Sequence, residues 1–120
     1  MGTNILKSPK RKGSDFELKV AKLIRQSGLD KKAQRRPLSG SNKMVAGYAD
    51  IISTLPFSFE LKKQEKLKIW EWWEQAESEA NMNRPPVLVF SSNFRPVMCA
   101  LKFEDFLQIL KELRDYRNKS

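Results

Sequence analysis

Two carboxylates and a lysine in the middle of the chain have residue types and a spacing that suit chemistry: Asp50, Glu60 and Lys62. We expect two short strands over residues 48–63, joined by a tight turn at Leu55-Pro56. Apolar and polar residues alternate in the second strand, so Glu60 and Lys62 share the face directed away from the apolar one. In an antiparallel hairpin with this turn, Asp50 falls opposite Glu60 on the same face.

Carboxylates that face each other across two strands are unfavourable unless a cation lies between them. Hard oxygen donors suit magnesium or manganese held together with several waters. Lys62 beside such an ion could hold or help deprotonate an attacking water, or neutralise charge on a phosphate. The alternative interpretation is a solvated strand face with an ordinary ion pair across the strands.

Composition narrows the possible chemistry. The 120 residues are enough for one domain, and they contain no histidine, which excludes a histidine general base, a Ser-His-Asp triad and a histidine-ligated zinc site. The formal net charge of +9 is typical of a small protein that binds nucleic acid. Cys99 is the only cysteine, so we expect it to be a small buried residue and not part of a disulfide, which suits a cytoplasmic protein. No apolar run predicts a membrane span or a signal peptide.

The N-terminal residues 1–12 are predicted to form a disordered basic arm ahead of a single domain over residues 13–120. The arm either contacts phosphates or has no role; its cations nearest the domain are Lys10, Arg11 and Lys12. A first helix is expected from about Ser14 to Ser27, with Ser14 and Glu17 at capping-box spacing and Gly28 as a left-handed cap.

A basic segment precedes Asp50. We expect a short strand within residues 29–38, followed by a Gly- and Ser-rich loop over residues 37–47. The segment is either a phosphate-binding rim or an exposed edge strand protected by its cations. The residues that would contact DNA here are Arg35, Arg36, Lys43 and the loop serines Ser39 and Ser41.

The second half of the chain alternates helix and strand. A helix is predicted over about residues 66–82, with Trp70 and Trp73 in the core and the role of Trp72 left open. Strands follow at residues 87–90 and 95–101. A final helix begins at Phe103 or Glu104, and its tail is expected to fray from Arg114. Its predicted buried stripe is Phe106, Leu107, Leu110 and Leu113.

The order of these motifs resembles the PD-(D/E)XK nuclease superfamily and, more narrowly, the archaeal Holliday junction resolvases and their phage relatives. The chain carries Lys12-Gly13 before Glu17, then Gln34-Arg35-Arg36, Ser39-Gly40-Ser41, Asp50 and Glu60-Leu61-Lys62. It departs from that pattern where Ala49 replaces the usual proline, where Leu18 replaces an arginine, and in a long segment between residues 40 and 50.

The resemblance implies a restriction-endonuclease-like α/β fold, a central mixed sheet flanked by helices. It also implies Mg²⁺, for which Mn²⁺ can substitute, bound directly by Asp50 and Glu60. Glu17 would bind through water or complete a second metal site, the Leu61 carbonyl would add a ligand, and Lys62 would position the attacking water. Some nucleases of this superfamily also place a glutamine, here Gln75, near the metal.

The function we expect is that of a magnesium-dependent endonuclease that resolves four-way DNA junctions in recombination and repair. Two symmetric incisions favour a homodimer, with the last strand and helix as its contact. The enzyme would act in the cytoplasm, either on the nucleoid or, for a viral protein, in the cytoplasm of the host cell. Two alternatives are a nicking, repair or restriction-type nuclease of the same fold, and a non-catalytic basic DNA-binding module.

Overall fold

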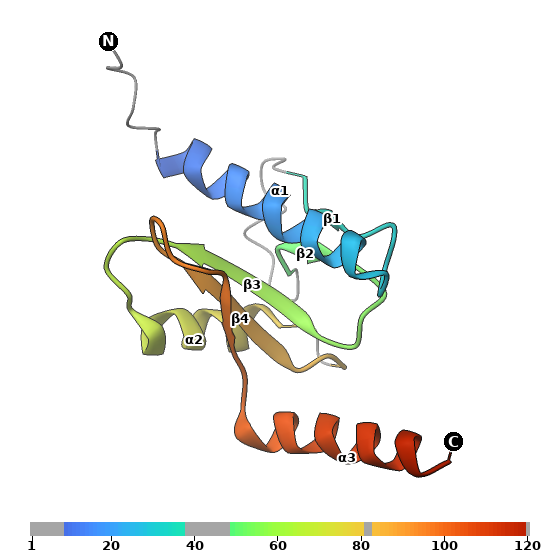
Figure 1. Cartoon of the computed structure of the whole chain (residues 1–120). Coiled ribbons are helices and arrows are strands. Elements are labelled where there is room, and N and C mark those ends of the chain that lie inside the picture. Colours follow the sequence, from blue (N-terminus) through green and yellow to red (C-terminus); the bar gives the residue numbers. More distant parts are fainter. Residues whose placement is uncertain (1–8, 38–48, 81–82, 120) are drawn as a thin grey trace.

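The computed structural model describes residues 9–37, 49–80 and 83–119, with side chains from residue 13 onward (Figure 1). The elements follow the predicted order of helix, three strands, helix, two strands and helix. They are α1 (Pro9–Ser27), β1 (Gln34–Arg35), β2 (Ile51–Ile52), β3 (Ser58–Lys63), α2 (Ile69–Glu79), β4 (Pro86–Ser91), β5 (Met98–Ala100) and α3 (Phe103–Lys119).

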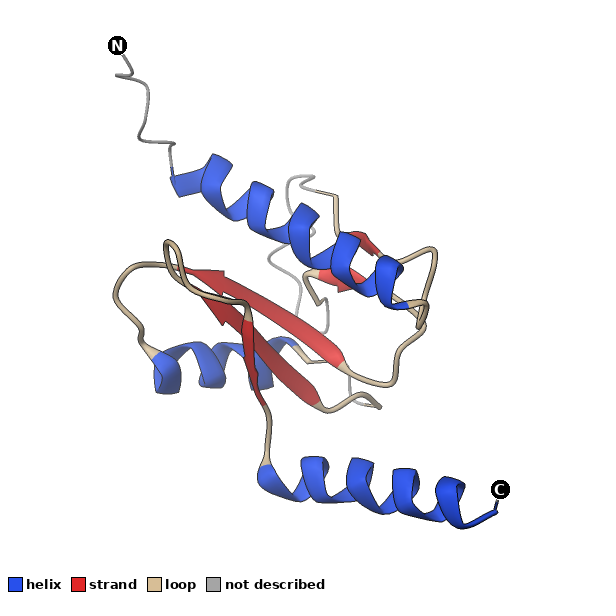
Figure 2. Cartoon of the chain, viewed as in Figure 1, coloured by secondary structure: helices blue, strands red, loops and turns tan. Residues whose placement is uncertain are grey.

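A mixed three-stranded sheet forms the centre of the fold. β3 runs parallel to β4, and β4 is antiparallel to β5. α1 and α2 both pack on β3, and α2 also packs on β4 (Figure 2). The parallel pair needs a crossover, which α2 supplies. The predicted α/β class, with a mixed sheet flanked by helices as in the restriction-endonuclease-like fold, is confirmed.

The two helices cover opposite faces of β3. Leu61 belongs to the apolar cluster that includes Phe16 and Val20 of α1. Successive residues of a strand point to opposite faces, so Glu60 points toward α2. Leu88 is aligned with Glu60 in the register and is fully buried on that same face. β3 is therefore buried on both sides, and a charged residue in its middle has little access to water.

The first helix is longer than predicted. α1 begins at Pro9, so Ser14 lies inside the helix and does not cap it, and residues 9–12 of the expected disordered arm are helical. Proline is well suited to a first helical turn because its missing N–H needs no partner there. Gly28 has φ +85° and closes the helix, as predicted. Residues 1–8 lie outside the described residues.

The predicted hairpin is wrong in its pairing. β2 pairs antiparallel with β1, and β3 pairs with β4, so the expected antiparallel hairpin over residues 48–63 does not form. The backbone of the connection has other partners: Arg84 donates to the Ser53 carbonyl at 2.8 Å, and the Thr54 amide donates to Asp30 at 2.8 Å. These contacts from distant parts of the chain replace the local strand pairing that a hairpin would need.

The tryptophans and the cysteine also differ from prediction. Trp72 is the buried tryptophan, Trp73 is partly buried, and Trp70 is 78% exposed. α2 faces the sheet with Trp72 and Ala76, which are four residues apart and share one helix face. Cys99 is exposed because β5 is the edge strand of the sheet.

The final helix does not bury its apolar stripe. α3 continues to Lys119 without fraying from Arg114, and none of its residues is buried.

Among the described helices, none combines the length and the apolar character required to cross a membrane.

A buried carboxylate ties the segment after α1 to the segment after β2. Asp30 accepts hydrogen bonds from the Lys32 amide at 2.9 Å and from the Thr54 amide and hydroxyl. These bonds, first of all that from the Thr54 amide, hold the pKa of Asp30 below its ordinary value of 3.8. Because a lowered carboxyl pKa means that the folded state prefers the charged form, Asp30 stabilises the fold above its ordinary pKa.

We predict that Asp30→Asn lowers the thermal unfolding midpoint at neutral pH, because an amide cannot accept all three bonds in place of the carboxylate. The difference from wild type should shrink as the pH falls through the lowered pKa, where wild-type Asp30 becomes protonated as well. Thermal melts followed by circular dichroism at a series of pH values measure this. Asp115→Asn on the exposed surface of α3 is the matched control. Equal melting of the Asp30 variant and wild type at neutral pH would contradict the role of Asp30.

Candidate active site

The sequence-predicted residues meet in one cavity of about 150 Å³. It lies between α1, β3 and α2, beside the segment that leads into β2. Its lining residues are Glu17, Arg36, Asp50, Glu60, Leu61, Lys62, Gln75 and Glu79. All five residues predicted for catalysis or metal binding are in that set, although they come from three separate parts of the chain.

Asp50 is fixed against the free edge of β3 by its backbone and its side chain. Its amide donates to the Phe59 carbonyl at 3.0 Å, and its Oδ2 accepts from the Leu61 amide at 2.8 Å. The Arg36 amide donates to the Asp50 carbonyl at 2.8 Å. Asp50 and Glu60 are therefore neighbours, as predicted. Hydrogen bonds between Asp50 and the edge of β3 hold them together, and not the strand pairing of a hairpin.

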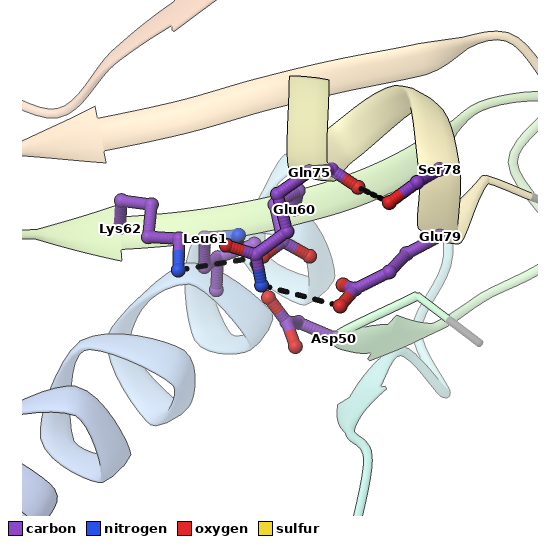
Figure 3. A network of polar contacts seen from close by, with 7 residues as sticks. All are labelled: Asp50, Glu60, Leu61, Lys62, Gln75, Ser78 and Glu79. Carbon is purple, nitrogen blue, oxygen red and sulfur yellow. Dashed lines mark hydrogen bonds and ion pairs between the residues drawn. The ribbon is translucent and has the colours of Figure 1, made fainter. Parts of the chain in front are cut away.

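Glu60 is 4% exposed and lies on the α2 side of β3 (Figure 3). Its Oε2 is 3.8 Å from Lys62 Nζ, whereas its Oε1 is buried without a hydrogen-bond partner among the described residues. Burial first, and then the nearby Asp50 and Glu79 carboxylates, raise the pKa of Glu60 to about 10. Negative charge at Glu60 therefore needs a cation that the surrounding side chains do not fully supply.

Glu17 reaches the same cavity from α1. It is 8% exposed, and its Oε1 is 3.7 Å from Arg35 Nη1. That Arg35 nitrogen is buried and makes no hydrogen bond to the described residues. Arg36 lines the cavity and donates from Nε to the Ala49 carbonyl. Arg35 and Arg36, which were predicted to form a DNA-binding rim, thus lie close to the acidic residues of the cavity.

A glutamate that sequence reasoning did not single out completes the cavity. Glu79 lies on α2 four residues after Gln75, whose Nε2 donates to Glu79 Oε1 at 3.2 Å. Figure 3 shows both side chains extending from α2 toward Glu60. The available signal was the four-residue spacing, which places Gln75 and Glu79 on one helix face. Only the docking of α2 on β3 directs that face to the site.

Several predicted DNA contacts are not described structurally. Ser39, Ser41 and Lys43 lie outside the described residues, as do the side chains of Lys10, Arg11 and Lys12. Their roles stay predictions.

The donors of the cavity suit a divalent cation. Within residues 9–37, 49–80 and 83–119, no group of three or more Asp, Glu, His or Cys side chains is already arranged as a metal site. The orphaned Oε1 of Glu60 and the crowding of Asp50 and Glu60 nevertheless fit an ion that needs hard oxygen ligands and retains waters. Two carboxylates with waters satisfy Mg²⁺, whose coordination sphere seldom consists of protein groups alone.

The raised pKa of Glu60 predicts an unusual pH dependence of stability. A carboxyl with a raised pKa stabilises the fold fully below its unfolded pKa, and this contribution is lost as the pH rises toward about 10. The unfolding midpoint of metal-free protein should therefore fall with rising pH, with a shallower slope in Glu60→Gln. Added Mg²⁺ should raise the midpoint of wild type more at higher pH, since only ionised Glu60 binds it well.

Differential scanning fluorimetry across this pH range, with and without Mg²⁺, measures both effects. Glu74→Gln on the exposed side of α2 removes a carboxyl away from the cavity and should keep the wild-type slope. Identical slopes for wild type and Glu60→Gln would contradict the raised pKa.

Comparison with known proteins identifies the family. A family model described as phage putative PDDEXK endonuclease matches residues 8–120. Searches among curated proteins and among solved structures found no match to this chain. Nucleases of the PD-(D/E)XK kind generally use divalent metals. Because the family model spans nearly the whole sequence and the acidic cavity lies within it, the chain belongs to this family of PDDEXK phage endonucleases.

Proposed function

We propose that this protein is a magnesium-dependent endonuclease that resolves four-way DNA junctions. The observation that supports it best is the convergence of Asp50, Glu60 and Lys62 in one partly enclosed cavity of a chain from an endonuclease family. An ordinary surface ion pair would not explain a glutamate that is 4% exposed and has an oxygen without a hydrogen bond.

Asp50 and Glu60 would hold the metal directly, with the Leu61 carbonyl as a further ligand and Glu17 acting through water or at a second site. Mn²⁺ would substitute for Mg²⁺ because it also prefers oxygen ligands. The bound ion would lower the pKa of a water and offset negative charge on the phosphate. The hydrogen bond from the Leu61 amide to Asp50 holds that carboxylate in place before the metal binds.

Lys62 would position the attacking water. Its ammonium lies 3.8 Å from Glu60 Oε2, so it is close to the proposed ion but remains a separate cation. The water oxygen forms a bond to phosphorus, the bond from phosphorus to one ester oxygen breaks, and that oxygen leaves with a proton. Positive charge near the attacked phosphate stabilises the charge that develops on its oxygens.

The substrate we propose is a four-way DNA junction. The motif order from Lys12-Gly13 through Glu60-Leu61-Lys62 is similar to that of junction resolvases, and the net charge of +9 favours binding of polyanionic DNA. Junction resolution requires two symmetric incisions, so the enzyme would act as a two-fold homodimer with one cavity in each copy. It would serve recombination or repair of DNA in the cytoplasm, either on the nucleoid or, for a viral protein, in the cytoplasm of the host cell.

The decisive experiment compares a four-way junction with linear duplex of the same arm sequences, in Mg²⁺ and in EDTA. Metal-dependent, paired cuts in the junction support the proposal. Cleavage of duplex and junction at equal rates would instead indicate a same-fold nuclease with another substrate. Binding without cleavage in Mg²⁺ or Mn²⁺ would indicate a non-catalytic DNA-binding module.

Asp50→Asn is expected to abolish junction cleavage while DNA binding survives or tightens, because a carboxylate that repels phosphate is lost with the metal ligand. Glu60→Gln should behave in the same way. Cleavage gels and fluorescence anisotropy in Ca²⁺ separate the two properties, and Glu74→Gln is the control for loss of an acid. Full cleavage by Asp50→Asn or Glu60→Gln would refute the assigned metal ligands.

Lys62→Ala is expected to lower the single-turnover cleavage rate by about 100-fold or more with little change in DNA affinity, as for a charge that acts mainly in the transition state. Lys66→Ala, which removes an exposed lysine from the β3–α2 loop, is the matched control. If Lys62→Ala instead weakens binding and leaves the rate at saturating protein unchanged, the lysine only anchors phosphate.

A further inference from the structure

α3 lies apart from the rest of the domain (Figure 2). It follows β5 directly and makes no extensive packing contact with any other described helix or strand. An ion pair of 3.6 Å between Lys102 and Glu77 ties the start of the helix to α2, but both side chains are about half exposed. Isolated helices of this length are marginal in water, so α3 requires a partner surface to be stable.

The apolar residues of α3 have the spacing of a helix–helix seam. They alternate at intervals of three and four residues, which is the a/d pattern of a coiled coil. The residues that form this seam are at least 42% exposed in the single chain, whereas Ile109 is partly buried. The seam consists of Phe103, Phe106, Leu110 and Leu113, with Leu107 at its edge. A stripe of this kind on a short helix is more than the scattered apolar exposure of an ordinary surface.

The charges of α3 indicate which occupant fits the seam. The first turn carries Glu104 and Asp105, whereas the last turn carries Arg117 and Lys119. A second α3 packed antiparallel brings the acidic end of each helix toward the basic end of the other, and it also opposes the helix dipoles. Parallel packing would instead place acid beside acid and base beside base. The helix is thus complementary to itself in one orientation.

We propose that α3 pairs with α3 of a second copy, antiparallel about a two-fold axis, through the seam defined above. Such an isologous contact uses the same surface on both copies, so it closes and leaves no unpaired seam. The proposal rests on the homodimer of the proposed function and names its surface. The cavity with Asp50 and Glu60 is formed by α1, β3 and α2, so pairing through α3 leaves it available to DNA.

The mass in solution tests the pairing. Light scattering of the full chain at tens of micromolar should give twice the 14.0 kDa chain mass. Leu110→Glu should reduce the mass to that of one chain, because it places charge in the centre of the seam. Gln108→Glu adds the same charge on the outer face of α3 and should stay dimeric. A monomeric wild type, or a Leu110→Glu variant that remains a dimer, would overturn the proposal.

The orientation has its own test in a Cys99→Ser background, which removes the single native cysteine. Variants that carry Glu104→Cys or Arg114→Cys are mixed, allowed to exchange, and treated with a short bifunctional thiol reagent. Antiparallel pairing predicts that conjugates between the two variants dominate. Dominant conjugates of the Glu104→Cys variant with itself would indicate parallel pairing and refute the assigned orientation.

Cleavage assays distinguish a failure of α3 pairing from a failure of the nuclease function. Leu110→Glu should still nick plasmid DNA in Mg²⁺ at the wild-type rate per chain, while the paired cuts in a junction fall at least about tenfold. The core of the domain should stay folded in Leu110→Glu, since α3 does not contribute to the apolar cluster around α1 and β3. A wild type that cuts no DNA refutes the nuclease function, whereas the masses and cross-links still decide the pairing.

Discussion

The burial of Glu60 opposite Asp50 is the constraint on which the rest of the domain depends. Burial and the nearby carboxylates raise the pKa of Glu60 to about 10, so the site favours a proton or a cation at that position. An unpaired buried charge costs several kcal/mol, and proteins retain such groups mainly where they function. The fold therefore gives up stability at this position to keep two carboxylates close together.

Both layers around the sheet contribute to that arrangement. On one side Leu61 anchors β3 in the apolar cluster with α1, which also carries Glu17 into the cavity. On the other side α2 covers Glu60, while its Gln75 and Glu79 extend the polar lining. Because side chains on a strand alternate, Leu61 packs in the apolar core while its neighbours Glu60 and Lys62 line the acidic cavity.

A domain of this size has few apolar side chains, and they are distributed unevenly between the core and the surface. The core lies between α1, the sheet and α2, whereas the apolar stripe of α3 stays at the surface. An exposed stripe of this kind favours association, because burying it removes apolar area from water at about 25 cal/mol per Å². In this arrangement the acidic cavity and the surface available for a partner are separate parts of the molecule.

The sequence by itself predicted the element order, the α/β class and five residues that line the acidic cavity, namely Glu17, Asp50, Glu60, Leu61 and Lys62. Alternation in β3 and the helical spacing of apolar residues are local properties, so they can be read without knowledge of the fold. The pairing of β2 with β1, the burial of Trp72, the exposure of Cys99 and the arrival of Glu79 were decided by the tertiary structure.

The physical reason is that periodicity defines which residues of an element share a face, but not what that face packs against. The stripe of α3 was predicted correctly as a pattern and incorrectly as buried, because no described element of the same chain covers it. The segment after β2 was likewise predicted to be a hairpin turn. Its backbone groups instead bond to Arg84 and Asp30, which are 31 and 24 residues away from their partners. Contacts between residues so distant in the chain are a property of the folded domain alone.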